Sequence, residues 1–159
     1  MKRTILTLCV LSAIGGCKSS PLVLYNTSGE QRVWPYFLDQ PIVLAFWDTG
    51  NLECLECLTG LNTLSMRQGP IHLVGICTSS DRIKANRWMQ KERVRFEVIH
   101  DPEEELGRRL GVTSYPTFIF FGKNGEEIDR RLKIGTIQNW FDRERWRRRA
   151  VGEPEPPRY

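Results

Sequence analysis

Two cysteines three residues apart, Cys54 and Cys57, constrain the fold more than any other feature of this sequence. They follow a nearly continuous apolar run at 41–47, which is typical of a central strand buried on both faces. Behind the pair, leucines recur at near-helical spacing, at Leu55, Leu58, Leu61 and Leu64. We therefore expect the cysteines at or near the N-terminus of a helix that follows a buried strand.

A C-x-x-C pair in that position suits thiol–disulfide chemistry. The helix dipole and the free N–H groups at a helix N-terminus stabilise a thiolate on the first cysteine. We expect Cys54, nearer the solvent, to attack a substrate disulfide and Cys57, one turn further in, to resolve the mixed disulfide. A structural pair with no redox role is the alternative.

The same motif is also half of a zinc site, which needs two further ligands. Only Cys77, His72 and His100 are available, and none has a second C-x-x-C or an H-x-x-x-H spacing. The sequence therefore predicts no metal site. We expect both histidines at strand ends, without a chemical role. Cys77 closes a second apolar run at 71–77 and is expected to be a small core residue, with a third redox thiol as the alternative.

The rest of the chain alternates between strand and helix patterns. Helices are expected at 81–93, from Asp101 to Gly111 and at 136–149, the last one ending in several arginines. A short strand is expected at 96–99, and strands at 117–121 and 126–134 read as a β-hairpin. This order predicts an α/β fold, with a central mixed β-sheet flanked by helices.

Two segments resemble a known family. The run Gly111-Val-Thr-Ser-Tyr-Pro-Thr-Phe118 resembles the G-V-x-x-x-P-T loop of the thioredoxin superfamily. Phe46-Trp47 followed by the cysteine pair is similar to the F-W-A-x-W-C-x-x-C of membrane-tethered TlpA/ResA-type thiol–disulfide oxidoreductases. The resemblance covers roughly 31–149. It implies a thioredoxin-like fold with a cis-proline loop at Pro116, and substrate binding by Tyr115, Pro116 and Trp47.

The chain also departs from that pattern. The segment between Trp47 and Cys54 is longer, Glu53 replaces the usual tryptophan, and Ala45 stands where cytosolic thioredoxins carry a buried aspartate. Negative charge from Glu53 and Glu56 should raise the pKa of Cys54. We therefore expect a potential nearer ~ −270 mV, as in thioredoxin, than ~ −120 mV, as in DsbA. A reductant that works in an oxidising compartment must itself be re-reduced, which implies a membrane electron donor.

The N-terminal segment reads as a targeting signal. Lys2 and Arg3 precede an apolar stretch at 5–14, too short for a span of about 20 residues. Ile14-Gly15-Gly16-Cys17 resembles the bacterial lipobox, which implies lipidation of Cys17. The expected organisation is a signal peptide at 1–16, a tether at 17–30, a thioredoxin-like domain at 31–149 and a flexible tail at 150–159. Ordinary secretion and an uncleaved anchor are the alternatives.

The formal charge of +4 falls to +2 once Lys2 and Arg3 are removed, which does not suggest a nucleic-acid partner. The sequence thus predicts a cofactor-free enzyme on the periplasmic face of a bacterial membrane, inner or outer. The family resemblance implies that it exchanges disulfides with envelope proteins, for example by reducing cytochrome c precursors. Disulfide oxidation or isomerisation and a non-catalytic binding module are alternatives. A peroxiredoxin is disfavoured, because Thr49 precedes Cys54 by five residues and not by three.

Overall fold

A computed structural model describes residues 20–35, 41–66, 72–122, 124–132 and 152. The expected signal peptide, the Cys17 lipidation site and the expected helix at 136–149 lie outside these residues. Within them the chain forms seven strands and three helices. In chain order these are β1 (Leu22–Asn26), β2 (Gln31–Trp34), β3 (Ile42–Trp47), α1 (Leu52–Ser65), β4 (His72–Cys77), α2 (Arg82–Lys91), β5 (Glu97–His100), α3 (Glu105–Arg109), β6 (Thr117–Phe121) and β7 (Glu127–Arg131).

All seven strands belong to one mixed sheet, in the order β2-β1-β5-β4-β3-β6-β7. The three central strands, β5, β4 and β3, run parallel, and the other neighbours pair antiparallel. The parallel strands are connected through α1 and α2, as parallel neighbours require. The mixed sheet flanked by helices confirms the predicted architecture.

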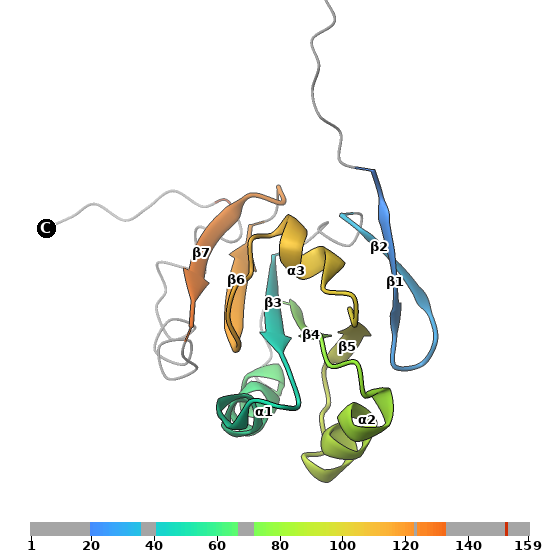
Figure 1. Cartoon of the computed structure of the whole chain (residues 1–159). Coiled ribbons are helices and arrows are strands. Elements are labelled where there is room, and N and C mark those ends of the chain that lie inside the picture. Colours follow the sequence, from blue (N-terminus) through green and yellow to red (C-terminus); the bar gives the residue numbers. More distant parts are fainter. Residues whose placement is uncertain (1–19, 36–40, 67–71, 123, 133–151, 153–159) are drawn as a thin grey trace, which may run out of the picture.

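The helices cover both faces of the sheet. Side chains of α1 and α2 pack into one buried cluster, whereas Leu106 of α3 belongs to the cluster on the opposite face. Figure 1 shows α1 and α2 below the strands and α3 above them. β3 contributes alternate residues to both clusters, with Val43, Ala45 and Trp47 on the α1 face. This explains its continuous apolar sequence.

The N-terminal hairpin corrects one expectation. Residues 22–26 were expected to be part of a tether at 17–30, yet they form β1 of the sheet, whereas residues 31–34, inside the expected domain, form the edge strand β2. β1 alternates buried and exposed residues, and Leu22 and Leu24 enter the α3-side cluster. A half-buried strand of five residues has only a short alternating pattern, which a polar, turn-rich context obscured.

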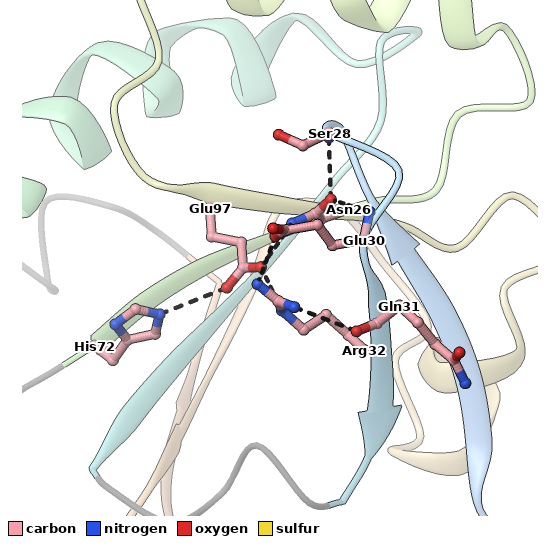
Figure 2. Close-up of polar contacts among 7 residues, drawn as sticks. All are labelled: Asn26, Ser28, Glu30, Gln31, Arg32, His72 and Glu97. Atoms are coloured by element: carbon pink, nitrogen blue, oxygen red, sulfur yellow. Dashed lines mark hydrogen bonds and ion pairs between the residues drawn. The ribbon is translucent and has the colours of Figure 1, made fainter.

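A polar cluster joins this hairpin to β5 and β4 (Figure 2). Glu97 of β5 accepts hydrogen bonds from Arg32 at 2.6 Å and Asn26 at 3.1 Å, and lies 3.7 Å from His72. Arg32 also pairs with Glu30 at 3.0 Å. The pKa of Glu30 is lowered, first by the Asn26 hydrogen bond and then by the Arg32 charge. The cluster fixes the hairpin to the central strands.

The segment after β5 differs in detail from its expected helix. α3 begins at Glu105, four residues after Asp101, because Glu104 adopts a left-handed conformation with φ of 53°. Asp101 nevertheless supplies the cap, since its carboxylate accepts the N–H groups of Glu105 at 2.9 Å and Gly107 at 3.0 Å. None of the described helices combines the length and apolar character needed to cross a membrane.

Candidate active site

The cysteine pair lies in the first two turns of α1, as the leucine spacing predicts. Asn51 precedes the helix and caps it: its Oδ1 accepts the Glu53 N–H at 2.9 Å, and its backbone carbonyl accepts the Cys54 N–H at 3.1 Å. Neither Cys54 nor Cys57 is joined in a disulfide. The local sequence therefore places two reduced sulfurs at the carboxyl edge of the parallel strands, where such sheets bind ligands.

Both thiols are covered, which contradicts one prediction. Cys54 was expected to be the more exposed sulfur, yet its exposed fraction is 0% and that of Cys57 is 4%. Both residues pack into the α1-side cluster against Ala45 and Trp47. The helix begins before Cys54, at Leu52, so the first cysteine is turned toward the sheet while Leu52 is 77% exposed. Substrate access thus requires a local opening.

Burial raises the pKa of Cys54 to about 11. The backbone N–H of Asp48 donates to the sulfur and opposes this shift, whereas the charges of Asp48 and Glu53 reinforce it. The predicted direction is therefore right, but its main cause is burial and not charge. Glu56 is exposed and is not among the groups that shift this pKa.

The proline loop lies next to the start of α1. The Tyr115–Pro116 peptide bond is cis, as the family resemblance implied. The Tyr115 carbonyl accepts a hydrogen bond from Asn51 Nδ2 at 2.6 Å. Pro116 is buried, and Tyr115 is partly buried. A single side chain, Asn51, thus caps the cysteine-bearing helix and binds the proline loop.

The side chain of Tyr115 is partly buried. Burial raises its pKa; a hydrogen bond with Thr78 opposes that shift, and the charge of Glu104 adds to it. Its ring packs against both buried clusters. Tyr115 therefore anchors the loop to the sheet at the same edge that carries the cysteines.

Trp47 does not occupy the place that the resemblance implied. Its exposed fraction is 1%, so its side chain cannot touch a substrate in this conformation. The indole Nε1 has no hydrogen-bond partner and lies over Gly75, where an added Cβ would approach it to 3.2 Å. Trp47 is a core residue in the same buried cluster as the cysteines, and its predicted contact with a substrate, like that of Cys54, requires a local opening of the site.

The acidic group whose charge acts most on Cys54 is one that sequence reasoning missed. Ala45 is in register with Gly75 and Phe118, so those positions bring no carboxylate to the cysteines. Asp48, directly after β3, acts electrostatically on both Cys54 and Cys77. Its position at the carboxyl end of the central strand was the available signal.

Cys77 is buried, as predicted, with an exposed fraction of 0%. It shares the α1-side cluster with Cys54 and Cys57. Burial raises its pKa to about 12, and the Cys54 thiolate is one of the charges that contribute. Among the described residues, no group of three or more histidines, cysteines or acids is placed to hold a metal ion.

Residues 19–127 match the model of the AhpC/TSA family. No curated protein matches the sequence. Three solved structures have a similar fold. A putative thiol:disulfide interchange protein DsbE from Chlorobium tepidum has a TM-score of 0.68 and 16% identity, over 76% of this chain and 90% of its own.

The other two are similar to the same extent. A secreted Mycobacterium tuberculosis disulfide oxidoreductase homologous to E. coli DsbE has a TM-score of 0.65 and 19% identity, over 74% of this chain and 92% of its own. The exposed lipoprotein thioredoxin of Streptococcus pneumoniae has a TM-score of 0.63 and 18% identity, over 76% of this chain and 97% of its own. At these identities the comparisons establish a thioredoxin-like fold.

Proposed function

The chain belongs to the AhpC/TSA family, and from that premise we propose that it is a thiol–disulfide oxidoreductase that uses Cys54 and Cys57. One observation carries the proposal. Two thiols three residues apart lie in the first two turns of a helix at the carboxyl edge of a thioredoxin-like sheet, and the cis Tyr115–Pro116 loop is hydrogen-bonded to the residue that precedes this helix. This arrangement suits exchange with the disulfide of another protein.

In the proposed reaction the reduced pair transfers two electrons to a substrate disulfide. The Cys54 thiolate attacks one substrate sulfur, the substrate S–S bond breaks, and the other substrate sulfur leaves as a thiolate. Cys57 then attacks Cys54 Sγ, forming the Cys54–Cys57 disulfide and releasing the second substrate thiol. The backbone of Tyr115 would hold the extended substrate, in which case the substrate displaces Asn51 from the Tyr115 carbonyl.

Burial of Cys54 favours a reductase over an oxidase. A thiolate that is poorly stabilised makes the reduced pair less stable relative to the disulfide, so electrons are donated more readily. The pKa of Cys54 lies above its ordinary value of 9.0, unlike that of a strong oxidant. We therefore expect a potential nearer ~ −270 mV than ~ −120 mV. In the cell a membrane electron donor would re-reduce the pair.

We further propose an envelope location with Cys17 as a lipid anchor. The lipobox-like sequence supports this, as do two structural neighbours described as a secreted protein and as an exposed lipoprotein. Disulfides of envelope proteins are then the substrate class, and cytochrome c precursors are one candidate. Mass measurement of the protein from membranes, compared with a Cys17→Ser variant, tests the anchor.

The deciding experiment is a redox titration of the full chain in defined thiol–disulfide buffers. Cys54→Ser and Cys57→Ser variants, both made together with Cys77→Ala, provide matched controls, because each removes one sulfur of the pair and leaves no third buried thiol to replace it. A reversible two-electron couple that both variants lose supports the proposal. A couple close to that of DsbA indicates an oxidase, and the absence of any couple leaves the binding-module alternative.

The two variants also decide which sulfur attacks. If Cys54 attacks, Cys57→Ser with Cys77→Ala accumulates a mixed disulfide with a model substrate, and Cys54→Ser with Cys77→Ala does not. The opposite pattern would assign the attack to Cys57, which has the slightly larger exposed fraction. Consumption of hydrogen peroxide by the reduced chain would instead indicate a peroxidase. The hydroxyl of Thr49, the threonine that precedes the cysteine pair, is hydrogen-bonded to the Ser79 hydroxyl at 2.7 Å.

A further inference from the structure

A row of side chains crosses the three parallel strands beneath the cysteine pair. The register places Trp47 of β3 beside Cys77 of β4, and Cys77 beside His100 of β5. Neighbouring strands lie about 4.8 Å apart, and residues in register on parallel strands point to the same face. Trp47 and Cys77 belong to the α1-side cluster, so His100 also faces the side covered by α1 and α2.

Cys54 lies against this row. Its sulfur accepts the backbone N–H of Asp48, which follows the strand partner of Cys77. The Cys77 sulfur accepts the backbone N–H of Ser79, two residues after its own strand. A hydrogen bond of 2.7 Å between Thr49 Oγ1 and Ser79 Oγ joins these two strand ends. Cys54 and Cys77 therefore share a buried environment bounded by the same two loops.

The third residue of the row, His100, has a buried ring nitrogen with no hydrogen-bond partner among the described residues. His100 has an exposed fraction of 8%, and its Nε2 is buried without a hydrogen-bond partner. Burial and the charge of Arg82 lower the pKa of His100. A buried ring nitrogen without a partner is uncommon in a folded protein. Here it lies beside a buried thiol.

We propose that Cys77 is a second disulfide partner of Cys54, so that the centre can hold its disulfide either as Cys54–Cys57 or as Cys54–Cys77. The inference rests on the proposed function, which supplies the first disulfide. In the exchange, Cys77 Sγ attacks Cys54 Sγ, the Cys54–Cys57 bond breaks, and Cys57 leaves with the electron pair. Cys77 loses a proton and Cys57 gains one, and the imidazole of His100 is the polar group in register beside Cys77.

No electrons enter or leave the protein in this step. The exchange therefore stores the oxidised state in a buried bond and returns Cys57 to the thiol form. Because the pKa of Cys77 is raised to about 12, its thiolate is scarce at neutral pH. At any pH below the pKa, each rise of one pH unit is expected to increase the exchange rate roughly tenfold, since the thiolate is the attacking species.

The sequence allows the two bonds to be distinguished by mass. Trypsin leaves Cys54 and Cys57 together in the peptide 33–67 and Cys77 in the peptide 68–82, because no lysine or arginine lies within either segment. A Cys54–Cys57 bond stays inside one peptide, whereas a bond to Cys77 joins the two. Cleavage after Glu53 and Glu56 then separates Cys54 from Cys57 and identifies the partner of Cys77.

The test uses the full chain with Cys9→Ser and Cys17→Ser, equilibrated with oxidised glutathione. Cys57→Ser is expected to convert its Cys54–glutathione mixed disulfide into a Cys54–Cys77 bond, with release of glutathione. The matched control, Cys57→Ser with Cys77→Ala, should retain the mixed disulfide. If Cys57→Ser also retains it and the joined peptides never form, the proposal is overturned.

A second measurement does not depend on the folding of a variant. The oxidised chain with Cys57 intact is incubated at increasing pH, and the joined peptides should accumulate faster as pH rises. Failure of this exchange while the Cys54–Cys57 bond forms normally would refute the role of Cys77 alone. Failure to form the Cys54–Cys57 bond would instead refute the proposed function.

Discussion

The pKa of Cys54 offers a direct test of how burial controls this centre. Its value of about 11 exceeds the ordinary 9.0 by about two units. At 1.36 kcal/mol per unit, this corresponds to about 3 kcal/mol of preference for the neutral thiol in the folded protein. At pH 7 roughly one molecule in 10,000 carries the thiolate, compared with roughly one in 100 for an unperturbed thiol of pKa 9.0.

The perturbation that isolates the charge contribution is Asp48→Asn. It removes a negative charge that acts on Cys54 but keeps the backbone N–H that donates to the sulfur. We expect the pKa of Cys54 to fall, by less than the whole shift, because burial is the largest cause. The resulting thiolate fraction at pH 7 should rise severalfold.

The assay is the ultraviolet absorbance of the thiolate as a function of pH, taken as the difference between the wild type and Cys54→Ser. Both proteins carry Cys77→Ala, because the charge of Cys54 also acts on Cys77, and circular dichroism at each pH shows that the chain is folded. A wild-type midpoint at or below 9.0 would refute the burial argument. An unchanged midpoint in Asp48→Asn would refute the role given to that charge.

Three further results are expected. The folded protein raises the pKa of Cys77 from 9.0 to about 12, so the stability linked to this thiol is complete below pH 9 and is lost as pH rises toward 12. In urea unfolding, the free energy of unfolding of Cys77→Ala should therefore fall less at alkaline pH than that of the wild type. Asn51→Asp keeps the cap acceptor but removes the donor to Tyr115, and should cost about 1 kcal/mol in urea unfolding and alter KM more than kcat for a disulfide substrate. Gly75→Ala places a Cβ 2.9 Å from the Phe96 ring and should destabilise the fold by about 1–3 kcal/mol through overpacking, measured by thermal or urea unfolding.

The sequence predicted an element correctly where a long periodic pattern or a short specific motif marks it. The apolar run of β3, the helix behind the cysteines and the cis bond before Pro116 were all predicted, from periodicity or from a short motif. The short strand β1 was not, since five residues provide only two or three alternations. Local patterns identify an element when it is long enough to repeat them.

The geometry of the site was harder to predict, because it depends on how elements pack. Whether Cys54 faces solvent or the sheet depends on where α1 begins, and helix boundaries are the least predictable part of an element. The link from Asn51 to the Tyr115 carbonyl joins residues 64 positions apart, and the proximity of Asp48 to Cys77 results from strand register. Neither relation leaves a mark in the local sequence.

The outermost strands of the sheet have a consequence for how the protein behaves at high concentration. An unpaired strand edge invites backbone pairing with a second molecule, which leads to aggregation. β7, at one end of the sheet, reads Glu-Ile-Asp-Arg-Arg, and β2, at the other, carries Arg32. Charges of both signs on β7 must be desolvated before another strand can add there. The cysteine-bearing helix follows β3, the third strand counted from β7, so the centre can open beside a sheet whose charged edge resists self-association.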